Sequence, residues 1–161
     1  MATASNIYLF SRAIRTGKTT ELTGWCKGKN AAGILTPNVE GRRVLLDIAT
    51  GNQHMLELQI RLECSISIGR FHFDNEVFRI GRDILLQAKC NSPEWLVVDE
   101  VGPLEIKRRE GLEPALGAIV EHYKRSGSNL LLVVRDSLLE EVVRHYNLEN
   151  SVVIHHLNDI P

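Results

Sequence analysis

Two short polar stretches, far apart in the chain, carry the side chains best suited to chemistry. Residues 17–20 read Gly-Lys-Thr-Thr and follow an apolar run and a turn, whereas residues 99–100 read Asp-Glu and follow a second apolar run. Lysine and the free N–H groups at the start of a helix bind phosphate oxygens. A threonine hydroxyl and a carboxylate are oxygen ligands that suit Mg²⁺, and a further carboxylate can take a proton from water. These residue types predict phosphoryl chemistry on a bound polyphosphate.

The first stretch has the layout of a phosphate-binding loop. A short apolar strand, a turn and a helix that opens with Gly-Lys-Thr follow one another in the order that such a loop requires. We expect Lys18 to reach the β- and γ-phosphates and the hydroxyl of Thr19 to ligate Mg²⁺. Thr16, Gly17 and Thr20 are expected to belong to the same nucleotide-binding loop.

Two arginines stand where this kind of loop carries glycines. The pattern G-x-x-x-x-G-K-[ST] and its fuller form place glycines at positions that are occupied here by Arg12 and Arg15. Glycine accepts positive φ and lets the backbone approach phosphate, whereas another residue in that conformation costs about 1–2 kcal/mol. Two interpretations are open: the arginines add phosphate contacts, or they fill the anion site themselves.

The second stretch ends a strand that is predicted over residues 95–98. Because ligands of an open parallel sheet lie outside the carboxyl ends of its strands, Asp99 should lie on the same rim as the loop. Asp99 is then placed to hold Mg²⁺ through water, and Glu100 to orient and deprotonate the attacking water. Arg135 ends another predicted strand, and it either contacts the γ-phosphate or forms a salt bridge with Asp136 or Glu100.

Strands alternate with helices through most of the chain, which predicts an α/β fold with a three-layer arrangement and a mainly parallel sheet. The predicted helices are 19–29, 75–90, 114–126 and 137–146, and the predicted strands are 7–10, 33–36, 43–48, 55–60, 62–68, 95–98, 130–134 and 152–154. Of these, 43–48 and 55–60 should form an antiparallel hairpin at a sheet edge. Residues 69–74 are predicted to be a loop, and Ser137 with Glu140 a capping box.

The composition points to an ordinary globular domain. The chain has 161 residues, of which 43% are hydrophobic and 24% charged, so we expect one domain over residues 1–161. Its formal net charge of -1 gives no indication of nucleic acid or an anionic membrane as a partner, and no protein partner is indicated. The N-terminus lacks the pattern of a signal peptide, and no apolar run approaches the roughly 18 residues of a membrane span.

The cysteines indicate the compartment rather than a site. Cys26, Cys64 and Cys90 are odd in number and lack metal-ligand spacing. We therefore expect reduced thiols in a cytoplasmic protein.

The residues that follow the second stretch make a family resemblance specific. Residues 99–105 read Asp-Glu-Val-Gly-Pro-Leu-Glu, which resembles the second nucleotide motif of the small P-loop nucleoside-triphosphatase family that includes the cancer-related nucleoside triphosphatase. Gly-Ile-Leu-Thr at 33–36, Gly-Arg-Arg at 41–43, Gly-Arg-Phe at 69–71 and Val-Val-Arg at 133–135 agree with it. The resemblance covers nearly the whole chain.

The resemblance implies a RecA-like P-loop fold and Mg²⁺-dependent hydrolysis of ATP, GTP and other nucleoside triphosphates to the diphosphate, with broad base tolerance. By position it assigns Lys18 to phosphate, Thr19 and Asp99 to Mg²⁺, and Glu100 to the role of catalytic base. The chain departs from the family at the two loop arginines, where the family carries glycines.

Two other functions are compatible with these motifs. One is a binding module that holds a nucleotide or phosphate without hydrolysing it, as the loop arginines would suggest. The other is a nucleotide or small-molecule kinase, for which residues 107–109, Lys-Arg-Arg, are the candidate lid. Glu105 is expected to support its loop rather than to react, and Arg42 and Arg43 either face the nucleotide or flank the hairpin.

Overall fold

A parallel β-sheet forms the middle layer of the protein. The computed structural model describes residues 6–13 and 16–161, so Arg15 of the predicted loop lies outside the described residues. The main sheet has the order β11-β1-β10-β9-β2-β4-β3, with β5 paired to β4. Its strands are β11 (Val152–Ile154), β1 (Ile7–Arg12), β10 (Asn129–Arg135), β9 (Trp95–Val101), β2 (Ala31–Leu35), β4 (Arg42–Asp47), β3 (Asn38–Val39) and β5 (Gln53–Met55). The strands from β11 to β2 are parallel, whereas β4 is antiparallel to β2.

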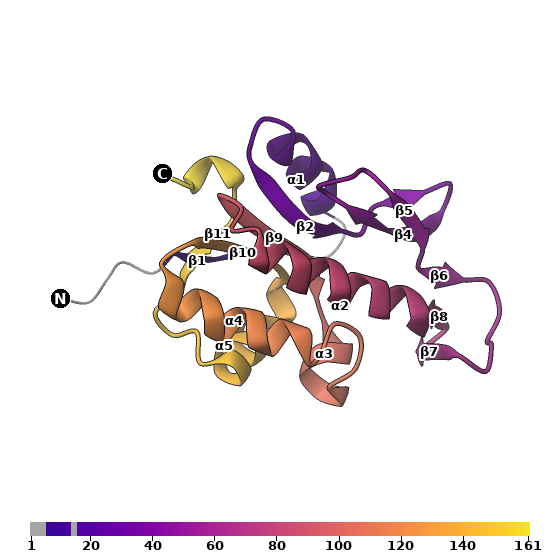
Figure 1. Ribbon diagram of the computed structural model, residues 1–161. Coiled ribbons are helices and arrows are strands. Elements are labelled where there is room, and N and C mark those ends of the chain that lie inside the picture. The colour runs from indigo at the N-terminus through magenta and orange to yellow at the C-terminus, as the bar shows by residue number, and fades with distance from the viewer. Residues whose placement is uncertain (1–5, 14–15) are drawn as a thin grey trace.

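Helices cover both faces of this sheet (Figure 1). The helices are α1 (Lys18–Cys26), α2 (Asn75–Cys90), α3 (Pro103–Arg108), α4 (Ala115–Ser126) and α5 (Leu139–Tyr146), with the 3₁₀ turns η1 (Asp136–Leu138) and η2 (Leu157–Asp159). Residues of α1 and η2 pack into the core on one face, and residues of α2, α4 and α5 pack into the core on the other. The expected three-layer α/β fold with a mainly parallel sheet is confirmed.

The continuous apolar runs of β9 and β10 follow from burial on both faces. In β9, Leu96 and Val98 belong to one core, whereas Trp95 and Val97 belong to the other. Side chains alternate between the faces of a strand, so a strand covered on both sides needs apolar residues at every position.

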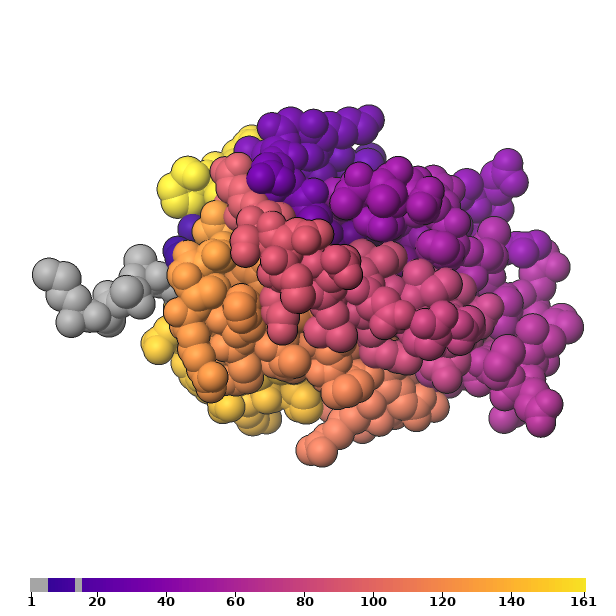
Figure 2. Space-filling model, viewed as in Figure 1, coloured from indigo at the N-terminus to yellow at the C-terminus, as the bar shows by residue number. Residues whose placement is uncertain are grey.

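A smaller sheet lies at one end of the molecule. It has the order β6-β8-β7, from β6 (Glu57–Leu58), β8 (Phe71–Asp74) and β7 (Ser65–Ile68), all antiparallel. Figure 2 shows this segment as the end of the molecule that lies farthest from the C-terminus. The predicted hairpin is present as β4–β5, but its second run is divided, because residues 57–58 leave the main sheet and pair with β8.

Several local predictions were wrong for identifiable reasons. The prediction of a loop over 69–74 was wrong, because residues 71–74 form β8, which pairs on both sides. Helix α3 was not predicted, because its six residues are too few to show a helical period. The capping box at Ser137 was also wrong, because Ser137 lies inside η1 and the following helix begins only at Leu139 without a side-chain cap.

Other boundaries match the prediction closely. Helix α2 spans Asn75–Cys90 as its amphipathic pattern predicts, and Asp74 caps it by accepting a hydrogen bond from the N–H of Glu76. A side-chain oxygen at this position satisfies one of the N–H groups that the first helical turn leaves free.

One extra residue in β9 changes how that strand ends. Val98 pairs with Leu132 and Val101 pairs with Val134, so three steps along β9 correspond to two along β10. Glu100 lies within this bulge and has φ 64°, a conformation that non-glycine residues rarely adopt. The bulge lies where the parallel strands reach their carboxyl ends, at the rim that the sequence associates with ligand binding.

Close packing between β2 and β9 depends on Gly33. Its φ is +116°, and a Cβ atom built there would lie 2.0 Å from the carbonyl oxygen of Val97. We predict that Gly33→Ala lowers the free energy of unfolding by more than about 3 kcal/mol, because the backbone of two central strands must move apart. Urea denaturation measures this loss.

Gly24→Ala is the matched control, since Gly24 lies in α1 and a Cβ atom added there would meet no neighbouring atom within 4 Å. It should stabilise the protein by about 0.5–1 kcal/mol. Equal effects of the two substitutions would contradict the packing argument.

Candidate active site

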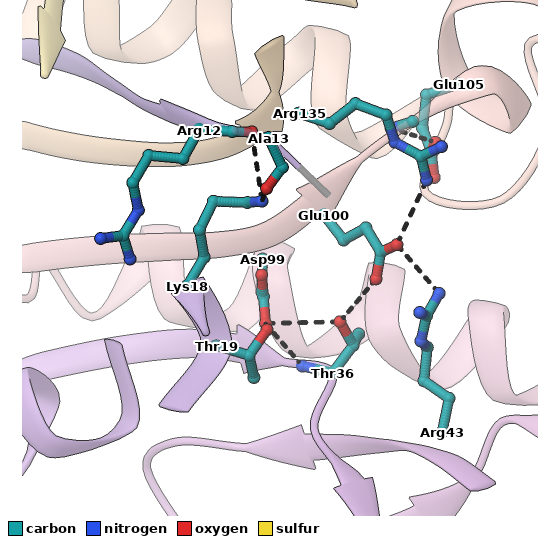
Figure 3. Close-up of polar contacts among 11 residues, drawn as sticks. Arg12, Ala13, Lys18, Thr19, Thr36, Arg43, Asp99, Glu100, Glu105 and Arg135 are labelled. Atoms are coloured by element: carbon teal, nitrogen blue, oxygen red, sulfur yellow. Dashed lines mark hydrogen bonds and ion pairs between the residues drawn. The ribbon is translucent and has the colours of Figure 1, made fainter. Parts of the chain in front are cut away.

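The two polar stretches of the sequence meet at the carboxyl ends of the strands. The hydroxyl of Thr19 donates a hydrogen bond of 2.9 Å to Oδ2 of Asp99, across 80 residues of chain. Thr19 lies in the first turn of α1, which follows β1, and Asp99 lies near the end of β9. Figure 3 shows these residues in one polar cluster with Lys18, Thr36 and Glu100.

Gly17 and Lys18 form the start of α1. Gly17 precedes the helix with φ 80° and ψ 19°, and its carbonyl accepts the first helical bond from the N–H of Glu21 at 3.0 Å. Nζ of Lys18 donates to the carbonyl oxygens of Ala13 at 2.9 Å and Arg12 at 3.3 Å. Partial burial, and then the charge of Arg12, lower the pKa of Lys18. The side chain of Lys18 therefore reaches from the first turn of α1 back to the end of β1.

The remaining loop residues have different surroundings. The hydroxyl of Thr16 donates to the carbonyl of Ala13 at 2.8 Å, and Thr20 is exposed in the first turn of α1. The guanidinium of Arg12 forms an ion pair with Glu21 and lies over the ring of Phe10. It points away from Asp99 and Glu100 (Figure 3).

Asp99 is the buried acid of the cluster. It is 2% exposed, and its Oδ2 accepts hydrogen bonds from the hydroxyl of Thr19, the N–H of Thr36 at 3.1 Å and the hydroxyl of Thr36 at 3.4 Å. Burial raises the pKa of Asp99, and the bond from the N–H of Thr36 opposes that effect. We did not predict that Thr36 belongs to this site, although a threonine at the carboxyl end of a buried strand could have indicated it.

The oxygen atoms of Thr19 and Asp99 fit a Mg²⁺ ion. Both are hard ligands on neighbouring elements, already within hydrogen-bond distance of each other. Among the described residues, no group of three or more His, Cys, Asp or Glu side chains is arranged to enclose a metal. This donor set suits an ion that a substrate phosphate and water help to hold, as Mg²⁺ commonly is.

Glu100 lies between two arginines. Its Oε1 accepts a hydrogen bond of 2.9 Å from Nη1 of Arg43 and lies 3.6 Å from Nη2 of Arg135, and its Oε2 accepts from the hydroxyl of Thr36 at 3.2 Å. Arg135 thus makes the salt bridge with Glu100 that was one of its expected contacts. Arg43 lies at the site rather than merely flanking the hairpin. Because the hydroxyl of Thr36 reaches both Asp99 and Glu100, the two carboxylates face the same side.

Glu105 supports the segment behind this cluster. It is 3% exposed and accepts hydrogen bonds from the N–H groups of Gly102 at 3.1 Å and Leu112 at 3.3 Å. Burial raises the pKa of Glu105 from 4.5 to about 7. This geometry agrees with a supporting role, since the carboxylate connects the start of α3 to the chain that leads into α4.

The family comparison decides which group of proteins this architecture represents. A family model described as NTPase matches residues 13–160 of the chain, which include the described part of the loop from Ala13 onwards and the whole of β9. The chain belongs to the NTPase family. This NTPase therefore has a nucleotide-binding, P-loop NTPase-type function, and the predicted family resemblance is confirmed.

Structural comparison supports the same fold. The crystal structure of THEP1 from the hyperthermophile Aquifex aeolicus is similar to this NTPase with a TM-score of 0.71 and 16% sequence identity, covering 96% of this chain and 92% of that chain. At that identity the likeness shows the shared fold. A search of the curated proteins finds no match to this chain. In the part of the chain that the structure describes, no helix is long and apolar enough to cross a membrane.

The raised pKa of Glu105 predicts a pH-dependent stability. The carboxyl ionises near 4.5 when unfolded and near 7 when folded, so the folded state binds more protons between these values and stability falls as pH rises. We predict that the free energy of unfolding of the wild type falls by roughly 3 kcal/mol relative to that of Glu105→Gln between about pH 4.5 and pH 8.

Urea denaturation at several pH values measures this difference. Glu63→Gln is the control, because Glu63 is exposed and its removal should leave the pH dependence of the wild type in place. If Glu105→Gln keeps the full pH dependence of the wild type, another group must be its source.

Proposed function

We propose that this NTPase hydrolyses ATP, GTP and other nucleoside triphosphates to the diphosphate and phosphate, in a Mg²⁺-dependent reaction with broad base tolerance. The observation that carries the proposal is the hydrogen bond of 2.9 Å between Thr19 and Asp99, which joins the loop helix to the acidic end of β9. It brings the proposed phosphate-binding and water-activating groups to one rim of the sheet.

The start of α1 supplies the proposed phosphate site. The N–H groups of its first turn carry partial positive charge, and Lys18 adds a full charge beside them. The Nζ atom now bonded to the carbonyls of Ala13 and Arg12 would exchange those bonds for β- and γ-phosphate oxygens. The other described residues proposed to bind the nucleotide here are Thr16, Gly17, Thr20 and Arg12. The guanidinium of Arg12 would first have to leave Glu21.

Thr19 and Asp99 are the residues that would hold Mg²⁺. A bound Mg²⁺ neutralises charge on the β- and γ-phosphate oxygens and so favours transfer of the phosphoryl group. Burial of Asp99 favours its neutral form, and hydroxyl and amide donors, rather than an ion pair, now satisfy its Oδ2. A cation at this position would compensate the charge of the carboxylate.

Glu100 is the proposed general base. The oxygen of a water molecule attacks the γ-phosphorus, the bond to the β,γ-bridging oxygen breaks, and a proton of the water passes to the Glu100 carboxylate. The bulge turns this carboxylate towards the side of Asp99, consistent with their shared contact with Thr36. Arg135 keeps a positive charge 3.6 Å from Glu100, close enough to act on a phosphate held at the same rim.

A second candidate function is a nucleotide-binding module with weak or no catalysis. In its favour, both the Lys18 ammonium and the Glu100 carboxylate already have protein partners, and Arg12 replaces a loop glycine. Nothing in the geometry of the described residues favours the kinase. Arg108 of the candidate lid donates to the carbonyl of Ser67 and pairs with Glu110.

We predict that Glu100→Gln reduces kcat for ATP and GTP about 100-fold or more, while the variant binds nucleotide at least as tightly as the wild type. The amide keeps the shape of the side chain, but it is far less basic than a carboxylate and cannot accept the proton of the attacking water. Phosphate release under saturating nucleotide and Mg²⁺ measures kcat, and calorimetry measures affinity. Unchanged turnover would remove Glu100 from the role of base.

Lys18→Ala separates the enzyme from the binding module. It should weaken triphosphate binding and abolish the phosphate release of the wild type, whereas Lys27→Ala, an exposed lysine at the other end of α1, should leave both intact. A wild type that binds triphosphate through Lys18 without releasing phosphate would establish the binding module instead.

A further inference from the structure

Arg43 reaches the site from an element that carries neither of the nucleotide motifs. The last pair between β2 and β4 joins Leu35 to Leu46, so the earlier residues of β4 extend beyond the carboxyl end of β2. There β4 pairs with β3 instead, through Asn38 and Arg43. The antiparallel pair of β3 and β4 therefore places the guanidinium of Arg43 at the same rim as the acids of β9 (Figure 3).

Glu100 is paired with more than one cation. Arg43 and Arg135 both approach one oxygen, Oε1, so two cations share a single carboxylate. The side chains of all three residues are 31% exposed, so the cluster is open to a ligand from solution. A further anion would bind here with less charge repulsion than at a balanced ion pair.

Arg43 also retains unused donors. A guanidinium has five N–H donors, and the bond to Glu100 uses one of them at 2.9 Å. The Nε atom of Arg43 is buried without a hydrogen-bond partner among the residues that the structure describes. Such a donor carries a desolvation cost that a properly placed acceptor would remove. Phosphate oxygens are acceptors that match the geometry of a guanidinium.

We propose that Arg43 is a further catalytic residue. When a triphosphate binds, its guanidinium leaves the carboxylate of Glu100 and contacts an oxygen of the γ-phosphoryl group. This inference rests on the proposed function. The guanidinium would neutralise charge on the phosphoryl oxygens as the bond to the bridging oxygen breaks. Its departure also removes the hydrogen bond of 2.9 Å that Oε1 of Glu100 now accepts from Arg43, so that this oxygen can receive the proton of the attacking water.

A purely structural role makes a different prediction. If Arg43 only holds Glu100 in its left-handed conformation, its removal should not affect γ-phosphate binding once the charge of Glu100 is gone. The test is therefore done in Glu100→Gln, which is compared with Glu100→Gln/Arg43→Gln. The probes are the β,γ-imido analogue of ATP and ADP, each with Mg²⁺.

We expect the second substitution to weaken binding of the imido triphosphate about 10- to 100-fold while ADP binds as before, since only the triphosphate carries the γ-group. In the wild-type protein, which keeps Glu100, Arg43→Gln should lower kcat. Arg43→Lys keeps the positive charge and should therefore lower kcat and triphosphate affinity less than Arg43→Gln does. Arg42→Gln is the matched control, because Arg42 precedes Arg43 on the same strand and is directed to its other face. It should change neither affinity.

Two results would overturn the inference: equal affinity of both variants for the triphosphate, or equal losses for triphosphate and diphosphate. Either result, alongside a wild type that releases phosphate from ATP, leaves the proposed function standing without Arg43. A wild type that neither binds nor hydrolyses triphosphate would reject both proposals. If Arg43→Gln does not fold, Arg43→Met, which keeps a long side chain but carries no charge, replaces it in the same comparison.

Discussion

The single extra residue in β9 is the constraint on which the arrangement of the rim depends. In a regular strand, Asp99 and Glu100 would point to opposite faces of the sheet, because successive side chains alternate. The bulge between Val98 and Val101 breaks that alternation and places Glu100 at φ 64°. This backbone conformation costs of order 1 kcal/mol or more, and the burial of the other residues of β9 offsets that cost. In return, one hydroxyl, that of Thr36, contacts both acids.

The parallel sheet explains why so many charged groups gather at one place. Both faces of its central strands are covered, so polar side chains can be solvated only where the strands end. Parallel strands end at the same edge, and the loops that leave β1, β2, β9 and β10 therefore share it. Burial then acts on the groups nearest the core, raising the pKa of Asp99 and Glu105. The site is thus a consequence of layer architecture as much as of motif.

Much of this architecture could be predicted from the sequence because its signals are local. The helical period of residues 75–90 and the unbroken apolar runs before Asp99 and Arg135 needed no tertiary information. Strand β8 and helix α3 lacked such signals, because they are short and depend on pairing and packing with distant segments. The position of Arg43 and the left-handed conformation of Glu100 depend on how a hairpin and a bulge are seated in the complete sheet, which no local pattern encodes.

The ion pair of Arg12 with Glu21 has a consequence for which residues suit position 12. Glu21 also accepts the N–H of Leu157 at 3.3 Å, so one carboxylate anchors the loop arginine and the C-terminal turn together. An arginine at position 12 without that acid would keep its contact with the ring of Phe10 but lose its ion pair, beside a Lys18 whose positive charge repels it. Positions 12 and 21 should therefore covary among homologous chains, with arginine accompanied by an acid and glycine free of that requirement.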